Sequence, residues 1–202
     1  MKPLRLYIKD FMCYDQSFID FNQFSSALII GKVSHNDLFS NGVGKTTIFK
    51  AIEYVLFNQS DSDLETIVRD DTDFCKIVLD FMIGDQEYRI SRTRTKKGST
   101  DFSLFERNDI AGNEYELYHN ANLVPHTDKK DIKKYWKNIS GSRTGDTEKD
   151  LAKLIKINYK SFRSTIHVVQ NDLYAGLSAA TPEKRKTIWK DALNLIIYSK
   201  LE

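Results

Sequence analysis

One run of the sequence combines the residue types that bind a polyphosphate: Gly42-Val43-Gly44-Lys45-Thr46-Thr47. Gly42 and Gly44 let the backbone curl without Cβ clashes, so that several N–H groups can converge on one anion. Lys45 can reach the β- and γ-phosphates of a nucleotide, and the Thr46 hydroxyl can ligate Mg²⁺. The run therefore predicts a site for a nucleoside triphosphate.

The elements around this run are those that a phosphate loop needs. Ala27–Ile30 is a short continuous apolar run that ends at Gly31, and it predicts a buried central strand. Apolar residues at helical spacing follow the loop and predict an amphipathic helix. These residues are Ile48, Ala51, Ile52, Val55 and Leu56. A chance Gly-Lys-Thr in an ordinary strand-helix turn is the alternative, but the strand-loop-helix order favours a phosphate loop over residues 31–47.

The first limb of the loop departs from the full motif. The motif places a further glycine at the position that Phe39 occupies, so we interpret Lys32–Ser40 as an insertion. The insertion could bring Lys32 or His35 near the phosphates, although a solvent-facing insertion is the simpler interpretation.

The rest of the chain reads as strands and then helices. Leu4–Ile8 and Ser17–Phe21 predict two strands paired across a turn at residues 14–16, and residues 75–107 alternate in the manner of antiparallel strands. Helices are predicted over residues 127–139, from Thr147, and from Thr181 as N-cap with Pro182 at the first position. The last helix is expected to run to the end of the sequence.

Composition narrows the class of protein. The chain of 202 residues is 41% hydrophobic and 29% charged, as in soluble globular proteins, and its net charge of +2 is far below that of a dedicated DNA-binding module. Its apolar runs are too short to span a bilayer, and we expect no secretion signal and no membrane partner. Cys13 and Cys75 lack metal-ligand spacing and are predicted to be buried free thiols in the cytoplasm, or near the nucleoid.

The loop Asn41–Thr47 resembles that of SMC- and SbcC-type ATPases, whose heads belong to the ABC class. Lys9-Asp10-Phe11 is similar to the end of that family's first strand, and Ile67–Arg69 to its short segment before an antiparallel sheet. His167–Asp172 resembles the family's Q-loop, and Thr181–Lys186 resembles the stretch that leads into the coiled coil of its DNA-break-repair branch.

The resemblance implies an α/β fold: lobe I of an ABC-type ATPase head, with a phosphate-loop strand-helix core, an antiparallel β subdomain and helices leading to a coiled coil. Residues 1–202 are then the N-terminal lobe, with the β region at about 75–107, the Q-loop at about 170 and the coiled-coil helix at about 181–202. ATP and Mg²⁺ are the implied cofactors. The implied nucleotide-binding residues are Asn41, Gly42, Val43, Gly44, Lys45, Thr46 and Thr47. Lys45 and Gln170 take catalytic roles, and Thr46 and Gln170 hold the metal.

Three departures from the family bear on activity. Met12 stands where many repair-type heads have a basic residue that touches the nucleotide. The Walker-B pattern of four apolar residues and Asp-Glu has one near match, Ile77–Asp80, but Phe81 follows it, and alternation predicts that Asp80 is an exposed strand residue. No Ser-Gly-Gly signature occurs either. In the family both motifs lie in a C-terminal lobe, so this polypeptide alone is expected to hydrolyse ATP weakly or not at all. We expect the chain to stop where the coiled coil begins, with Leu201-Glu202 as residues that could be non-native.

A basic hairpin predicts contact with nucleic acid. Its cations are Arg89, Arg92, Arg94, Lys96 and Lys97. Such a stripe gives sequence-independent, salt-dependent binding to phosphates. A solvated hairpin edge protected by charge is the equal alternative. A second basic run, Lys129–Lys137, alternates with acidic residues and reads as a solvated helix face.

The leading hypothesis is an ATPase head that processes DNA double-strand breaks. ATP would join two heads into a homodimer over DNA ends, each head completed by its own C-terminal lobe, and a nuclease subunit would act with them. An SMC-like DNA sensor of a prokaryotic defence system is the first alternative. A small-molecule phosphate-loop kinase is another, and a structural module with an inactive loop is the last.

Overall fold

The computed structural model describes residues 1–31, 42–60, 63–108, 118–119, 124–125, 135–167 and 181–192. Its contacts divide the chain into two compact units, Met1–Asp150 and Leu151–Glu202. The predicted insertion, the Q-loop from residue 168 on and the last ten residues lie outside the described residues.

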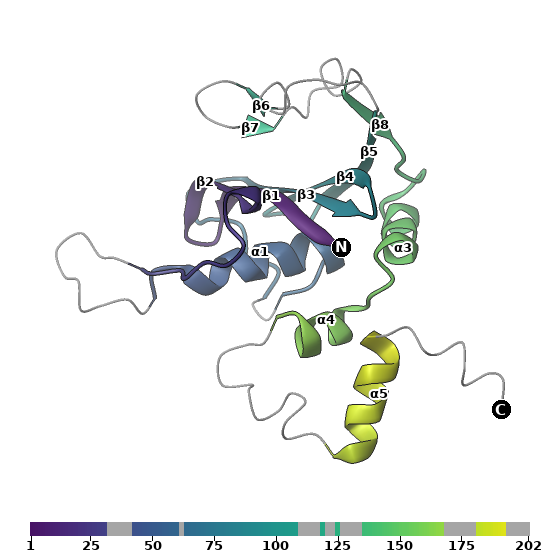
Figure 1. Ribbon diagram of the computed structural model, residues 1–202. Coiled ribbons are helices and arrows are strands. Elements are labelled where there is room, and N and C mark those ends of the chain that lie inside the picture. Colours follow the sequence, from purple (N-terminus) through teal and green to yellow (C-terminus); the bar gives the residue numbers. More distant parts are fainter. Residues whose placement is uncertain are drawn as a thin grey trace. The chain divides into compact units, whose positions relative to one another are not determined.

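The first unit is built on a six-stranded sheet in the order β2-β1-β3-β4-β5-β8, and every neighbouring pair is antiparallel (Figure 1). The strands are β1 (Lys2–Phe11), β2 (Tyr14–Asp20), β3 (Phe74–Ile83), β4 (Gln86–Thr95), β5 (Thr100–Arg107) and β8 (Trp136–Asn138). A separate two-stranded sheet pairs β6 (Tyr118–His119) with β7 (Val124–Pro125). The fold is thus mixed α/β with an antiparallel sheet, as predicted.

The alternating patterns set most of this sheet. In β3, Ile77 and Leu79 lie on one face and pair with Arg92 and Ile90 of β4. All four side chains are buried, and three of them are apolar. The strands of the 75–107 region are joined by turns at Gly84-Asp85 and at residues 96–99, where the Gly98 amide donates to the Thr95 carbonyl at 2.9 Å. The first turn differs from the prediction, because residues 14–16 belong to β2 and the chain reverses at Met12 and Cys13.

Helix α1 (Lys45–Phe57) packs against β1, β3 and β4 and covers one face of the sheet (Figure 1). Its buried residues include Ile48, Ala51, Val55 and Leu56, which confirms the predicted apolar face. Tyr54 lies in the same interface and stacks on Phe11 of β1 with the ring centroids 5.9 Å apart. The core between α1 and the sheet therefore fixes the helix that follows the phosphate loop.

The predicted central strand at Ala27–Ile30 does not form. Residues 27–30 have no regular secondary structure, and Leu28 and Ile30 are 84% and 68% exposed. A strand needs neighbours for its N–H and C=O groups, and no other described strand pairs with this segment. A short 3₁₀ helix, η1 (Phe21–Gln23), precedes it.

Asp80 is buried, and this corrects the prediction of an exposed residue. Its carboxylate accepts hydrogen bonds from Arg89 at 2.6 and 2.8 Å and from Arg5 at 3.2 Å. Arg5 also pairs with Glu87. Asp80 is therefore part of a structural ion pair. The prediction was wrong because the alternation of a single strand does not show that Arg5 and Arg89 lie opposite Asp80 on the two neighbouring strands.

Two other predicted elements have different bounds. Residues 136–138, predicted as the end of a charged helix, form β8, where Trp136 packs in a cluster with Phe105 and Tyr135. Helix α3 (Thr144–Ile155) begins three residues before the predicted start. The Thr147 hydroxyl, which lies in the first turn of α3, accepts a hydrogen bond from the Gly141 amide. Among the described residues, no helix is both long enough and apolar enough to span a bilayer.

The second unit contains α4 (Tyr159–Thr165) and α5 (Pro182–Ala192), which pack against each other. The Asn158 side chain caps α4 by accepting from the Ser161 amide at 2.8 Å. The predicted start of α5 is confirmed, because the Thr181 hydroxyl accepts from the Lys184 amide at 3.4 Å.

Candidate nucleotide-binding site

The second limb of the phosphate loop has the backbone that the sequence predicts. Gly42 and Gly44 both adopt left-handed conformations, with φ of 79° and 86°. Gly44 is the N-cap residue of α1, and no side chain caps that helix end. The amides of the first turn point toward this end of the helix, and the helix dipole adds partial positive charge at the same point. This arrangement fits a phosphate group.

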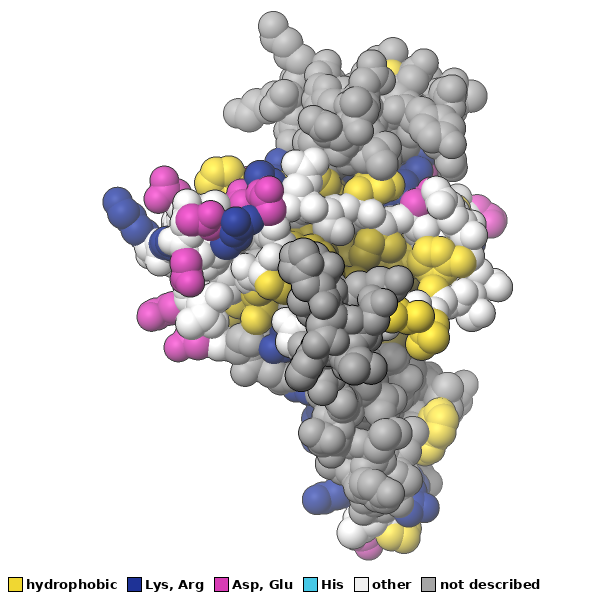
Figure 2. Space-filling model, turned by 90° about the vertical axis from the view of Figure 1, so that its left-hand side faces the viewer, with side chains coloured by type: hydrophobic (Ala, Val, Ile, Leu, Met, Phe, Trp, Pro, Cys, Tyr) yellow, Lys and Arg dark blue, Asp and Glu magenta, His cyan; other side chains and the backbone are white. Residues whose placement is uncertain are grey.

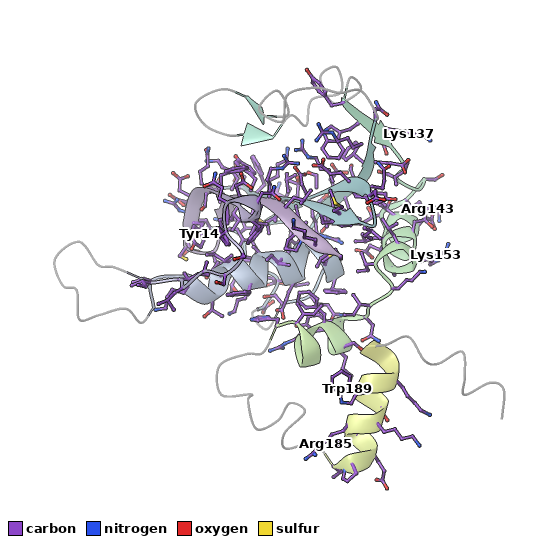
Figure 3. All side chains as sticks on the ribbon, in the orientation of Figure 1. Tyr14, Lys137, Arg143, Lys153, Arg185 and Trp189 are labelled. Carbon is purple, nitrogen blue, oxygen red and sulfur yellow. The ribbon has the colours of Figure 1, made fainter. Side chains whose placement is uncertain are left out.

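The turn between β1 and β2 lies directly against this limb. A Cβ atom on Gly44 would come within 2.5 Å of Cys13 Sγ, so only glycine fits there without a shift. The Tyr14 hydroxyl donates a hydrogen bond to the Gly44 carbonyl at 3.3 Å, and Tyr14 lies beside the start of α1 in Figure 3. The first hairpin therefore braces the phosphate loop.

The structure distinguishes the two threonines of the loop. Thr47 is 8% exposed, and its hydroxyl lies 3.7 Å from Cys13 Sγ. Thr46 is exposed in the first turn of α1. The exposure of Thr46 leaves its hydroxyl accessible, and its role as a metal ligand stays a prediction. Thr47 instead contacts the hairpin.

Several predicted site residues cannot be placed. Asn41 and Gln170 lie outside the described residues, as do Lys32–Ser40. Val43 and Lys45 are half-buried, the latter as the first residue of α1. The described part of the site therefore consists of Gly42 through Thr47 with the β1–β2 turn.

Sequence reasoning missed Cys13 and Tyr14. Cys13 is an exposed free thiol, and its predicted burial is wrong. Cys75 is a buried free thiol, as predicted, and its burial raises the pKa of the thiol to about 11. The Met12 amide donates to the Ile67 carbonyl at 2.8 Å, which fixes the turn from its other side. Cys13 and Tyr14 contact residues about thirty positions further along the chain, and no local sequence pattern predicts such contacts. The position of the hairpin shortly before the phosphate loop is the one feature of the sequence that points to them.

The predicted DNA stripe is divided between buried and exposed side chains. Arg89 is fully buried in its ion pair with Asp80, with its guanidinium 4.5 Å from the centre of the Trp136 ring. Arg92 is also fully buried: it donates to the Val55 carbonyl and to Glu148, and it lies 3.9 Å from the Phe102 ring. Burial lowers the pKa of Arg92, and the bond to Glu148 opposes this. A fully buried guanidinium cannot reach a DNA phosphate, so Arg89 and Arg92 cannot be among the DNA contacts that the sequence predicted.

The remaining cations of the hairpin are nearer to solvent. Arg94 is half-buried and donates to the Leu64 carbonyl at 2.9 Å. Lys96 and Lys97 are exposed at the turn between β4 and β5, and Lys96 also donates to the Asp70 carbonyl. The exposed part of the stripe is therefore the turn itself.

A comparison with protein families identifies the chain. A family model described as an AAA domain, AAA_23, matches residues 5–201. The chain belongs to this AAA domain family. Membership covers nearly the whole sequence, and ATPases of this kind use a nucleotide and commonly Mg²⁺.

Individual relatives of this AAA domain agree with the resemblance. The chain is 25% identical over 192 residues to the SbcC subunit of the nuclease SbcCD from Lactococcus lactis, a match that covers 91% of this chain and 16% of that protein. It is 28% identical over 126 residues to the SbcC subunit from Staphylococcus aureus, over 54% of this chain and 12% of that protein. The resemblance to the N-terminal region of an SbcC/SMC-type ATPase head is confirmed.

The chain spans less than a fifth of the length of these curated relatives. Among solved structures, the SMC head domain from Thermotoga maritima matches 52% of this chain and 37% of that one, with a TM-score of 0.39 and 23% identity.

Proposed function

We propose that this AAA domain is the ATP-binding N-terminal lobe of a head that dimerises on ATP and engages DNA ends together with a nuclease subunit. The observation that carries the proposal is the helix start at Gly44, preceded by a loop in which Gly42 and Gly44 are both left-handed. It occurs in a chain related over 91% of its length to an SbcC subunit of the nuclease SbcCD.

The residues of the site divide the work of binding. The amides of the first turn of α1 and the Lys45 ammonium hold phosphate oxygens, and the exposed Thr46 hydroxyl holds the metal. Gln170 is proposed to orient the attacking water and to complete the metal site. Bound Mg²⁺ supplies charge neutralisation at the β- and γ-phosphates, which is the main catalytic demand of phosphoryl transfer.

An exposed apolar groove supports the proposal that a C-terminal lobe completes the head. The groove holds about 900 Å³ and is lined by side chains from β1, β2, the 21–29 segment and α1, among them Ile19, Phe24, Ile29 and Phe49. Figure 2 views this side of the molecule and shows hydrophobic side chains at its surface. A groove lined by exposed apolar side chains is a candidate surface for a partner. We propose that the occupant is the C-terminal lobe that the resemblance to SbcC-type heads implies; the chain spans 16% of the length of such a relative.

ATP turnover tests this division. We expect the 202-residue chain to bind Mg²⁺-ATP but to hydrolyse it at a rate close to background, and to become active when a polypeptide with the C-terminal lobe is added. Lys45→Ala is expected to abolish both binding and activated turnover, because it removes the cation of the site. Full turnover by the chain alone would contradict the half-head assignment and favour a kinase-like phosphate-loop enzyme.

DNA contact is proposed through the exposed turn between β4 and β5. Replacing Lys96 and Lys97 by alanine together is expected to weaken binding to duplex DNA of any sequence and to reduce the salt-dependence slope by about 2. The matched control replaces two exposed lysines elsewhere in the first unit, Lys137 and Lys149. Equal losses in the two double variants would show nonspecific attraction to charge and would remove the turn from the proposal.

A further inference from the structure

We propose that Tyr14 is a positioning residue of the phosphate loop: its hydroxyl holds the Gly44 carbonyl so that the Lys45 amide faces the bound phosphate. The inference deepens the proposed function and rests on it. Nothing in the sequence motif or in the family match assigns a role to this tyrosine.

The contact involves an acceptor with two donors. The Gly44 carbonyl accepts from the Tyr14 hydroxyl at 3.3 Å and from the Thr47 amide at 3.1 Å. Both lone pairs of that oxygen are thus engaged, which fixes its direction. The same carbonyl therefore cannot turn toward the phosphate, where a second negative dipole would weaken binding.

Peptide planarity carries the effect to the site. In a trans peptide the C=O of one residue and the N–H of the next point in opposite directions. Holding the Gly44 carbonyl against Tyr14 therefore directs the Lys45 N–H away from the hairpin. That N–H belongs to the first turn of α1, and the amides at the start of a helix are the groups that face an anion bound there.

Tyr14 is itself well fixed. It pairs with Phe11 across the first hairpin, and the Met12 amide between them bonds to the Ile67 carbonyl. The Tyr14 ring also lies 3.6 Å from the position that a Cβ on Gly44 would take, so it packs on the glycine as well as bonding to it. Burial raises the pKa of Tyr14, which keeps the hydroxyl protonated and able to donate at neutral pH.

The need for an external restraint follows from the glycine. Gly44 has φ of 86° and no side chain to limit its rotation, and a glycine peptide flips more readily than any other. Cys13 fills the space beside it without donating to its carbonyl in any described contact. Of the two neighbours from the hairpin, Tyr14 is the one that sets the direction of the carbonyl.

The test compares Tyr14→Phe with Tyr88→Phe in the 202-residue chain. Tyr88 lies on β4 and stacks on Phe81, so its variant removes a hydroxyl remote from the loop. We expect Tyr14→Phe to weaken Mg²⁺-ATP binding roughly fivefold, the usual effect of one neutral hydrogen bond, and Tyr88→Phe to leave it unchanged. The melting temperature of both variants should stay near that of the parent chain. In a ¹⁵N spectrum of the ligand-free chain, only Tyr14→Phe should shift the Lys45 and Thr46 amide signals.

Lys45→Ala separates the two levels of the proposal. If it binds ATP as well as the parent chain does, the nucleotide-site assignment itself fails. If it loses ATP while Tyr14→Phe keeps full affinity, the nucleotide site stands and the role of Tyr14 is overturned. A Tyr14→Phe variant that loses affinity only in step with its melting temperature, with no selective shift of the two amides, would make Tyr14 a general structural residue and would also overturn the inference.

Discussion

Arg89→Ala is expected to destabilise the first unit by about 3–5 kcal/mol, the usual cost of removing one partner of a buried ion pair. Arg89 is fully buried and donates twice to Asp80, and its guanidinium also lies over the Trp136 ring. The variant leaves the Asp80 carboxylate with Arg5 as its remaining described cation and opens a cavity beside Trp136. Urea unfolding followed by circular dichroism measures the change.

A double-mutant cycle with Asp80→Ala shows where the loss originates. Since most of the cost lies in the carboxylate left behind, the double variant should be less destabilised than the sum of the two single variants by about 1–3 kcal/mol. Lys97→Ala, an exposed cation of the same hairpin, is the control and should change stability by less than about 0.5 kcal/mol. A loss below about 1 kcal/mol for Arg89→Ala would mean that the arginine is solvated and available to a ligand after all.

Gly44→Ala is expected to weaken Mg²⁺-ATP binding by roughly 30- to 100-fold, equivalent to about 2–3 kcal/mol. The added Cβ meets Cys13 Sγ at 2.5 Å, and the residue must also keep φ of 86° or abandon it. Either response moves the peptide that presents the Lys45 amide. Calorimetric titration of ATP into the variant and the parent chain checks the expectation.

Gly84→Ala provides the matched control for this effect. Gly84 also has a positive φ, of 58°, but nothing lies within 4 Å of its Cβ position. It should lose about 1 kcal/mol of stability from backbone strain and keep its ATP affinity. Cys13→Gly in the Gly44→Ala background should restore part of the affinity, because it relieves the clash and leaves only the strain. Undiminished ATP binding by Gly44→Ala would show that the loop shifts at no cost.

Local pattern was sufficient wherever one face of an element meets the core. The alternation of Ile77, Leu79 and Ile90 predicted the antiparallel strands, and the spacing of Ile48, Ala51 and Val55 predicted α1. The capping chemistry of Thr181 gave the start of α5 to the residue. In each case the information lies within one element, in its side-chain period or its cap.

The errors arise where the deciding partner is distant in the sequence. The apolar character of Ala27–Ile30 predicted a buried strand, but a strand also needs neighbours, and none of the described strands pairs with it. Asp80 and Arg89 read as surface charges because their pairing depends on the register of β1, β3 and β4. The contact of Tyr14 with Gly44 joins the start of β2 to the start of α1, which no periodicity links.

The contacts at the C-terminal end of α1 bear on how a displacement of the phosphate loop would be passed to α3. Arg92 bonds both to the Val55 carbonyl, in the last turns of α1, and to Glu148 of α3. A slide of α1 along its axis would therefore break a hydrogen bond to a buried charged side chain, so we expect α1 to tilt about Val55 as a pivot rather than to slide. Since the pivot lies about 15 Å from the loop end of the helix, small displacements of Gly44 and Lys45 become rotations that strain the junction with α3.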